Sequence, residues 1–526
     1  MILSKGIGID LGTTNSAVAV MDPTNTQVLV HTDGVGRTTT PSCVWRNPAT
    51  GELAVGHHAF QRRGSHPEPV RSVKRNMGSE VMSDLSGTPA SPVEISSMIL
   101  AELRAQAAED VAAFGAEDVR YTVDRAIITV PAYFGLPAIE ATRAAGQMAG
   151  LEVLELLNEP TAGAIHYCWK HDISEGLFLV YDLGGGTFDV TILDINGREI
   201  YIICSQGDHA LGGVDFDNKI LETLQKSYRE KFSAELVRSA EDQAKYEDES
   251  EDIKKTLSRR QVAKKMLYGP EGTHKIEITR AMFEEAICSL TARIDMLLDV
   301  ALEEAGLETS DIDKVLLVGG STRIPLVQNQ LQKRFAIEPE TTVNVDECVA
   351  LGAALHAGLT MLREKPDEVP AGIASGLGDI RLTDVCNHSY GTICAPIDKE
   401  TGKHVVENRI ILRKNTPLPC EATQMFYTIT EGQTEVEVNI TQGEDTDVRY
   451  VNKIAKHKFE LPPGRKAKCP IKVTYSYDVN QRMHCRFEDL ESGRTLEVEF
   501  CLDQSGQLSQ SKVKEKARQL EAVKVE

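Results

Sequence analysis

Residues 7–16 read Ile7-Gly8-Ile9-Asp10-Leu11-Gly12-Thr13-Thr14-Asn15-Ser16, and residues 180–190 repeat the pattern as Val180-Tyr181-Asp182-Leu183-Gly184-Gly185-Gly186-Thr187-Phe188-Asp189-Val190. In each copy an apolar run ends in Asp-Leu-Gly, the chain turns on glycine and threonine, and a second apolar run follows, which predicts two β-hairpins. Backbone amides exposed at such a turn bind phosphate, and an aspartate at the strand end can hold a hydrated Mg²⁺. A single turn of this kind is more often an ordinary hairpin. Two matched copies, each with its aspartate, predict a duplicated domain that closes on one nucleotide.

Composition narrows the class of protein. A chain of 526 residues has room for about three or four domains. Its 57 basic and 78 acidic residues give a net charge of −21, which argues against nucleic acid or an anionic membrane as the main partner. The 11 cysteines are scattered without Cys-x-x-Cys spacing, so neither a zinc site nor a disulfide framework is expected. With no signal peptide or transmembrane run predicted, we expect a cytoplasmic protein.

Two charged residues in the first half are candidates for phosphate chemistry. Lys74 lies in the segment Val70–Asn76 and has the length to reach a γ-phosphate, although a solvated surface lysine is the ordinary interpretation. Glu159 follows the apolar residues 156–157 at the start of a predicted helix. The helix dipole is a sufficient structural reason for a carboxylate there, and the functional alternative is a carboxylate that orients water in a cleft.

The second half adds further glycine turns. Residues 207–217 predict a glycine loop that leads into a helix, and a charged helix is expected over Ala240–Leu267, where Glu251, Lys254 and Ser258 share one face. Taken alone, that face is most simply a solvated one. Residues 314–323 are a third strand that turns on glycine into a helix, another seat for a phosphate or nucleoside. A last helix, with Asp346 as its expected cap, closes this domain near residue 362.

The pattern changes after residue 364. Residues 364–378 are rich in proline and glycine and predict a linker. Strict alternation of apolar and polar residues follows, as in Thr434–Thr441, and several such strands over about 120 residues predict a β-sandwich. The last residues, 511–526, predict a short charged helix or tail.

Five blocks of the sequence together resemble the seventy-kilodalton heat-shock chaperone family (heat shock protein 70, DnaK-like). They are residues 8–16, Thr129-Val130-Pro131-Ala132-Tyr133-Phe134, Asn158-Glu159-Pro160-Thr161-Ala162, residues 182–189 and Gly319-Gly320-Ser321-Thr322-Arg323-Ile324-Pro325. They occur in the family's order, and the resemblance covers about residues 5–500. It implies a multidomain α/β protein: an actin-like ATPase domain with ribonuclease H-like duplicated halves at 1–363, a linker at 364–385, a mainly-β sandwich that binds peptide at 386–503, and a short charged tail at 504–526.

The resemblance also implies the site residues. Asp10, Asp182 and Asp189 would organise Mg²⁺ through water, Lys74 would be the catalytic lysine, and Thr187 and Glu159 would lie near the γ-phosphate and the attacking water. With Asp10 and Asp182 these make the catalytic set, and the cofactors are ATP/ADP and Mg²⁺. The residues expected to hold the nucleotide are Gly12, Thr13, Thr14, Asn15, Gly184, Gly185, Gly186, Gly212, Gly213, Glu251, Lys254, Ser258, Gly319, Gly320, Ser321, Arg323 and Asp346.

Three positions depart from the family's pattern. The linker usually carries a run of leucines between acidic residues, but here it reads Asp379-Ile380-Arg381-Leu382-Thr383-Asp384-Val385. Arg381 and Thr383 remove two apolar anchors, and burying a leucine contributes about 1.5–3 kcal/mol, so we expect this linker to dock more weakly. Ile139 stands where the family commonly has an arginine that relays the nucleotide state, and Glu155 stands where an arginine meets J-domain co-chaperones. That charge reversal predicts weak J-domain stimulation, whereas a nucleotide exchange factor remains an expected partner.

The peptide pocket is mixed in character. Phe426, Val436 and Val438 match positions that line the family's pocket, and Ile429 matches an arch over it, although alternation alone explains the valines equally well as sandwich core. Residues 388–393 are more polar than the usual first strand. Only a short segment follows the last strand, so we expect no long helical lid and fast release of bound peptide.

Three functions remain open at this point. The leading one is an ATP-dependent chaperone of unfolded or extended polypeptide, active in protein folding and the stress response. The second is a nucleotide-gated scaffold with one dedicated partner. The third is an actin-like small-molecule kinase, which shares the phosphate hairpins, but the C-terminal sandwich and the block 158–161 argue against it.

Overall fold

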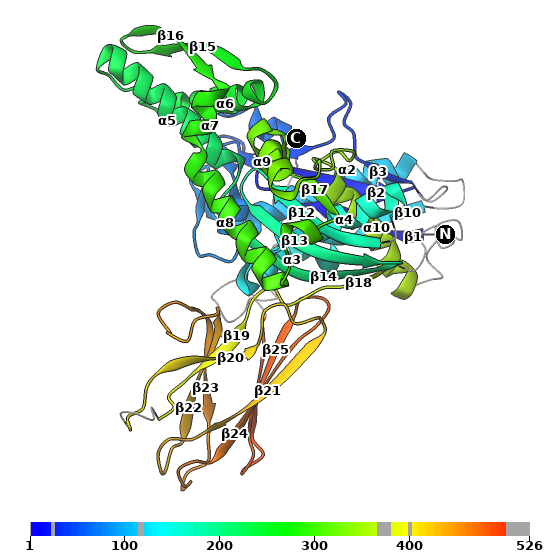
Figure 1. The fold of residues 1–526 in the computed structure, drawn as a ribbon, viewed down its shortest axis with the longest axis vertical. Helices are drawn as coiled ribbons and strands as arrows, with labels where there is room; N and C mark the ends of the chain where they lie inside the picture. The colour runs from blue at the N-terminus through cyan, green and yellow to red at the C-terminus, as the bar shows by residue number, and fades with distance from the viewer. Residues whose placement is uncertain are drawn as a thin grey trace.

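Two mixed sheets with matching strand orders form the larger body of the molecule (Figure 1). The computed structural model describes residues 2–22, 27–113, 120–173, 175–364, 380–397 and 402–500. The first sheet has the order β11 (Glu152–Asn158), β10 (Arg120–Val130), β1 (Ile2–Asp10), β2 (Asn15–Met21), β3 (Val28–Val30), with β4 (Thr40–Pro41) paired to β2. The second has the order β17 (Lys314–Val318), β12 (Glu175–Leu183), β13 (Phe188–Asn196), β14 (Glu199–Asp208), β18 (Arg381–Thr383).

The two sheets repeat one plan. In each, a hairpin forms the first two strands, β1–β2 or β12–β13, and a later parallel strand, β10 or β17, pairs with the first strand of that hairpin. This repetition confirms the predicted duplicated α/β fold.

Helices cover both faces of the sheets. Helix α10 (Cys348–Glu364) packs against β1 and against α4 (Glu159–His171) in the layer between the sheets. A Cβ at Gly352 would lie 1.8 Å from the carbonyl oxygen of Ala162, so only glycine permits this helix contact. The helix α2 (Pro92–Ala113) packs on α3 (Leu136–Met148) and on β10, and α8 (Cys288–Ala305) packs along β13 and β14.

Smaller elements extend from each half. The first half carries β5 (Cys43–Arg46), β6 (Leu53–Val55), α1 (His57–Phe60), β7 (Val70–Arg71), η1 (Val73–Asn76), β8 (Ser83–Leu85) and β9 (Thr88–Ala90). The second carries α5 (Gly213–Phe232), α6 (Ala240–Arg259), β15 (Val262–Gly269), β16 (Gly272–Thr279), α7 (Arg280–Ala286), η2 (Thr309–Asp311), η3 (Gly320–Arg323) and α9 (Pro325–Phe335).

The predicted helix over residues 240–267 is wrong beyond Arg259. Residues 262–269 instead form β15, which pairs with β16 across a Gly-Pro-Glu-Gly turn. Ala263 and Leu267 are both buried, and a spacing of four places two side chains on one face of either a helix or a strand. That spacing therefore did not discriminate between the two structures, whereas the turn sequence favoured a hairpin.

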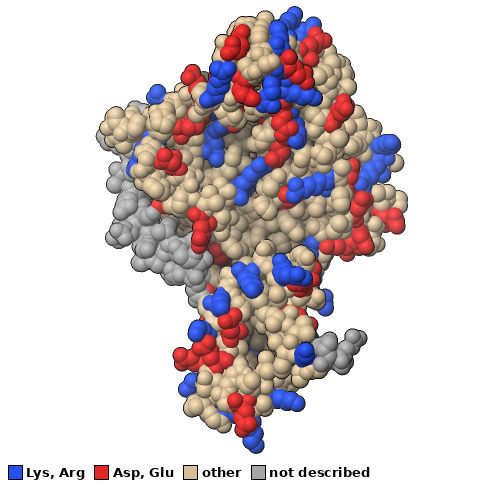
Figure 2. Space-filling view, turned by 90° about the vertical axis from the view of Figure 1, so that its left-hand side faces the viewer, with Lys and Arg blue, Asp and Glu red and all other residues tan. Residues whose placement is uncertain are grey.

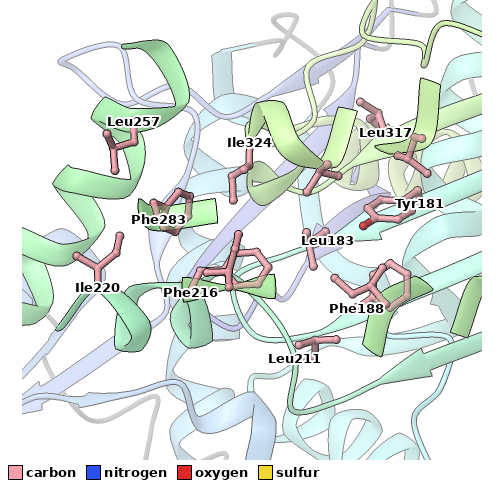
Figure 3. Packing of buried hydrophobic residues seen from close by; sticks show 14 of the residues in the cluster. Tyr181, Leu183, Phe188, Leu211, Phe216, Ile220, Leu257, Phe283, Leu317 and Ile324 are labelled. Atoms are coloured by element: carbon pink, nitrogen blue, oxygen red, sulfur yellow. The ribbon is translucent and has the colours of Figure 1, made fainter. Parts of the chain in front are cut away.

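The core of the second half joins its sheet to these extra helices (Figure 3). Tyr181, Leu183 and Phe188 from the hairpin pack in one cluster with Phe216 of α5 and Phe283 of α7. The glycine-rich turn between β12 and β13 is thus anchored by a buried apolar core on its own strands.

The smaller body is a β-sandwich, as predicted. One sheet has the order β20 (Glu407–Leu412), β19 (Tyr390–Cys394), β22 (Glu435–Gln442), β23 (Asn452–Glu460), and the other has the order β21 (Cys420–Tyr427), β24 (Pro470–Tyr477), β25 (Met483–Asp489), β26 (Thr495–Glu499). Alternate residues of β24 are buried, so one face of each sheet forms the shared core.

The two bodies are docked on each other. Leu136 of α3 is buried within the apolar cluster of the sandwich, Arg143 Nη2 donates to the carbonyl oxygen of Asn480 at 2.6 Å, and Lys414 pairs with Glu304 at 2.9 Å. Figure 2 shows both bodies from the side, with basic and acidic side chains interspersed on this face. None of the helices in the described ranges is long and apolar enough to cross a membrane.

The linker also docks in this structure. Residues 381–383 form β18, which pairs in parallel with β14, and Ile380 and Leu382 pack against the apolar layer between the sheets. Arg381 is exposed, so in this structure its position in the strand is not one that buries an apolar anchor. The expectation of weaker docking counted Arg381 as a lost anchor, and the strand's alternation removes that part of the argument. Residues 365–379 of the predicted linker and the predicted tail at 504–526 lie outside the described residues.

Candidate nucleotide site

The two glycine turns face each other across the middle of the larger body. A Cβ at Gly185 would lie 2.2 Å from Thr14 Oγ1, and a Cβ at Gly186 would lie 2.4 Å from Thr13 Cγ2. Glycine is therefore needed for this close approach, since any other side chain would separate the turns. The structure brings together the two copies of the motif that the sequence places about 170 residues apart.

A cavity of about 900 Å³ opens at these turns. A cavity of this size suits a nucleotide. Most of the predicted site residues line it: Asp10, Gly12, Thr13, Thr14, Asn15, Lys74, Glu159, Asp182, Gly184, Gly185, Thr187, Glu251, Lys254, Ser258, Gly319, Gly320, Ser321, Arg323 and Asp346.

Four residues predicted for this site do not line the cavity themselves: Gly186, which is part of the second turn, and Gly212, Gly213 and Asp189. Gly212 packs on the backbone of the second turn, because a Cβ there would lie 2.6 Å from the amide nitrogen of Gly186. Gly213 accepts a hydrogen bond of 2.9 Å from Lys254 Nζ through its carbonyl oxygen. Asp189 is 1 % exposed and accepts a hydrogen bond of 3.0 Å from the amide of Tyr133. These residues contact the residues that line the cavity and hold them in place from behind.

Three aspartates converge at the strand ends. Asp182 and Asp189 are direct partners across the β12–β13 hairpin, and Asp10 ends β1. Burial raises the pKa of Asp10 to about 7 and that of Asp189 to about 8, and the nearby charge of Glu159 adds to both shifts. Burial also raises the pKa of Asp182 well above its usual range, with Glu159 as the next cause. Like charges directly opposite each other destabilise a sheet, so this arrangement calls for a cation.

Lys74 and Glu159 form a buried ion pair beside these aspartates. Lys74 Nζ donates to Glu159 Oε1, and the two residues are 4 % and 6 % exposed. Lys74 comes from η1 in the first half, and Glu159 opens helix α4. The interpretation of Lys74 as a solvated surface lysine is therefore wrong. Glu159 keeps its place near the helix N-terminus and also points into the cavity lining.

The cavity is also lined by a second polar network. Lys254 Nζ pairs with Asp217 at 2.7 Å, and Ser321 Oγ donates to the carbonyl oxygen of Gly184 at 2.9 Å. Arg323 pairs with Asp346 at 2.8 Å, so Asp346 is an ion-pair partner next to α10. The α6 face with Glu251, Lys254 and Ser258 lines the cavity and is not merely solvated.

Several contacts of the site were not predicted from the sequence. Arg75 Nε donates to the carbonyl oxygen of Gly186 at 2.9 Å and its guanidinium pairs with Asp215 at 2.5 Å, which fixes the second turn from the first half. In the lining of the cavity, Arg63 pairs with Asp248, and Arg71 pairs with Glu247 at 2.7 Å. These pairs join residues 140 to 185 positions apart, so no local pattern signals them.

The residues present fit a magnesium nucleotide. Among the described residues, no three His, Cys, Asp or Glu side chains lie close enough together to hold a metal ion directly. The Thr14 hydroxyl is buried next to the paired turns and has no hydrogen-bond partner in the described structure, so it is available to donate to a phosphate oxygen. Four carboxylates, those of Asp10, Glu159, Asp182 and Asp189, surround the single ammonium of Lys74, so a bound cation would balance negative charge in the site.

The predicted peptide residues are differently placed. Val438 is 2 % exposed and belongs to the sandwich core, and Phe426 and Val436 pack against that core while remaining partly exposed. Ile429 is 44 % exposed just after β21. In this conformation Val438 therefore has the surroundings of a core residue.

A comparison with protein-family models agrees with this architecture. The model of the Hsp70 protein family matches residues 6–86 and 80–526. The match includes both glycine turns, the Lys74–Glu159 pair and the sandwich. Because it spans nearly the whole sequence, the chain belongs to the Hsp70 protein family and has that family's general, chaperone-type ATP-binding function.

Proposed function

We propose that this protein hydrolyses ATP to ADP and phosphate and uses the bound nucleotide to control its hold on extended, unfolded polypeptide. The observation that carries the proposal is the buried Lys74–Glu159 pair beside three aspartates, at the point where the two glycine turns meet. This arrangement supplies positive charge, a carboxylate and backbone amides around one small volume, as phosphoryl transfer to water requires.

The residues divide into three groups by chemistry. The amides of the two turns and the hydroxyls of Thr13, Thr14 and Thr187 would bind the phosphates. Asp10, Asp182 and Asp189 would hold Mg²⁺ through water, and that ion would supply positive charge next to the phosphates. The residues that would bind the adenosine are Glu251, Lys254, Ser258, Gly319, Gly320, Ser321, Arg323 and Asp346.

Lys74 is the main cation that the protein itself directs at the site. Its ammonium is desolvated and held by Glu159, so little reorganisation is needed when negative charge develops on a transferring phosphoryl group. Glu159 in turn presents its carboxylate at the cavity wall, where it can accept a hydrogen bond from a water molecule and so orient that water.

Single-turnover hydrolysis of ATP tests this proposal. One such electrostatic contact is worth about 3 kcal/mol, so Lys74→Ala should slow phosphate release roughly a hundredfold while ATP still binds. Lys219→Ala is the matched control, because Lys219 pairs with Glu222 on the exposed surface of α5. Unchanged hydrolysis in Lys74→Ala, with ATP affinity and thermal stability preserved, would overturn the catalytic assignment.

The proposed partners are unfolded polypeptide and a nucleotide exchange factor. Glu155 supports the prediction of weak J-domain stimulation, because its carboxylate is bound to His356 Nε2 at 2.8 Å and most of its surface is covered. Ile139 is 3 % exposed within the core of the first half, where it packs as an ordinary apolar residue.

A nucleotide-gated scaffold with one dedicated partner is the second candidate. The burial of Val438 favours it, since a pocket residue that belongs to the core is not available to a peptide in this conformation. The docked linker and the buried contacts between the bodies favour control by nucleotide in either case. The nucleotide dependence of peptide binding separates the two candidates.

A further inference from the structure

Two cysteine thiols meet where the linker enters the sandwich. Cys386 follows β18 by three residues, and Cys420 begins β21. Each thiol is the first cause of the shift in the other's pKa, which makes the two side chains neighbours, and Cys386 Sγ donates to the carbonyl oxygen of His388 at 3.1 Å. Two neighbouring cysteine side chains in suitable geometry can become bonded after a small side-chain movement.

Backbone hydrogen bonds bring the two segments together. The amide of Cys386 donates to the carbonyl oxygen of Thr416 at 2.9 Å, and the amide of Leu418 donates to that of Asp384 at 2.8 Å, so the two segments are paired. Cys420 lies opposite Tyr477 of β24, whose ring packs against that of Tyr390 with the centroids 5.7 Å apart. Both cysteines belong to the same apolar cluster as these tyrosines.

The two thiols differ in access and in acidity. Cys386 is fully buried, and its hydrogen bond to Cys420 together with burial raises the pKa of its thiol. Cys420 is partly exposed, and the same hydrogen bond lowers the pKa of its thiol. By contrast, burial raises the pKa of Cys43, Cys168 and Cys204 to about 12. An accessible, more acidic thiol next to a buried one is the arrangement of an attacking and a resolving cysteine.

We propose that Cys420 and Cys386 are a redox modification site, at which a hydroperoxide oxidises Cys420 and Cys386 then closes an intramolecular disulfide. The Cys420 thiolate attacks the O–O bond of hydrogen peroxide, gains one oxygen as a sulfenic acid, and releases hydroxide, which becomes water with the thiol's proton. The Cys386 sulfur then attacks the sulfenic sulfur, the S–S bond forms, the S–O bond breaks and a second water leaves. Two thiols are oxidised by two electrons and one peroxide is reduced to two waters.

The position of this bond matters for the junction between the bodies. Two residues before Cys386, Asp384 accepts a hydrogen bond of 2.9 Å from Asn158 Nδ2, and two residues after it, His388 Nε2 lies 3.2 Å from the carbonyl oxygen of Phe134. Both of those partners belong to the larger body. The disulfide would therefore tie to β21 the short segment that carries these contacts.

Mass spectrometry of the full chain tests the proposal. In a Cys394→Ser background, trypsin yields peptide 382–399 with Cys386 as its only cysteine and peptide 415–449 with Cys420 as its only cysteine. After treatment with hydrogen peroxide and alkylation of the remaining thiols, we expect these peptides to be recovered as one disulfide-linked species, with the loss of two titratable thiols. Dithiothreitol should separate them. Cys288→Ser is the matched control and should leave the link intact, because Cys288 is an exposed free cysteine on α8, outside the sandwich.

A second variant tests the order of the steps. In Cys386→Ala the sulfenic acid on Cys420 has no resolving thiol, so labelling of Cys420 by dimedone should increase over the wild type, in which the disulfide removes it. The proposal is wrong if peroxide that oxidises Cys288 fully leaves peptides 382–399 and 415–449 unlinked in the folded wild-type protein. It is also wrong if Cys420 is recovered from the wild type as sulfinic acid without the link.

Discussion

The amide of Tyr133 donates a hydrogen bond of 3.0 Å to Asp189 Oδ1, and this bond connects the proposed magnesium site to the loop that follows β10. The ring of the same tyrosine packs edge-on against His388 of the sandwich, with the ring centroids 4.8 Å apart. His388 also lies 3.2 Å from the carbonyl oxygen of Phe134. One short loop therefore contacts both a site aspartate and the sandwich, which gives the two bodies a physical route for coupling.

Removing the imidazole should weaken that coupling. We expect His388→Ala to reduce the effect of ATP on peptide affinity about fivefold, because it removes one buried contact worth about 1 kcal/mol from the docked state. Peptide affinity with ADP should change little. His484→Ala is the matched control, since His484 is half-exposed on β25 and pairs only with Glu499 in the described structure. An unchanged ratio of affinities in His388→Ala would contradict this route, and fluorescence anisotropy of a labelled peptide measures it.

The raised pKa values of the aspartates predict a pH dependence of stability. The pKa is about 7 for Asp10 and about 8 for Asp189 in the folded protein, against roughly 3.9 for an unfolded chain, so the folded state binds protons more strongly. Without nucleotide and Mg²⁺, this contribution is fully present below about pH 4 and is lost as the pH rises through about 7 and 8. The unfolding temperature should therefore fall across that range.

Asp189→Asn isolates this effect. The amide does not ionise, so we expect its unfolding temperature to fall less steeply between pH 6 and pH 9 than that of the wild type. Asp194→Asn, which changes a partly exposed residue of the same strand, should retain the wild-type slope. Equal slopes for the wild type and Asp189→Asn in calorimetry would show that Asp189 does not carry a raised pKa.

The docked linker predicts that the side chain of Leu382 helps to hold β18 against β14. Leu382 packs on the apolar layer between the sheets, and half-burying a leucine contributes about 1 kcal/mol. Leu382→Ala should therefore raise the fraction of undocked linker about fivefold, which a higher rate of tryptic cleavage after Arg381 would report. Val405→Ala, at an exposed position of the sandwich, should leave the rate unchanged. A wild-type rate in Leu382→Ala would mean that the paired strand does not depend on this side chain.

The fold and the site were predictable where the information is local. The Asp-Leu-Gly turns at Asp10 and Asp182 and the alternation in Glu435–Gln442 set the conformation of their own segments, so the hairpins and the sandwich were found from the sequence. Lys74 was placed in the site only through resemblance. Its ion pair with Glu159 joins residues 85 positions apart, and nothing in either segment specifies that contact.

The wrong expectations have equally specific causes. Ala263 and Leu267 fit a helix and a strand alike, and pairing with β16 decided between them. Asp346 was expected to cap a helix, but α10 begins two residues later, at Cys348, and Arg323 binds the Asp346 carboxylate. Arg381 was counted as a lost apolar anchor, and the direction in which a strand presents each side chain became known only once β18 was seen beside β14.

The affinity of a fluorescent, extended, leucine-rich peptide, measured with ADP and again with ATP, tests the central claim most directly. If nucleotide controls the sandwich, peptide binding should be clearly weaker with ATP than with ADP. In Lys74→Ala the peptide affinity measured with ATP should stay low for as long as the nucleotide remains uncleaved. Equal affinity with both nucleotides, or no binding with either, would contradict nucleotide-controlled peptide binding and would leave the dedicated-partner scaffold as the better description.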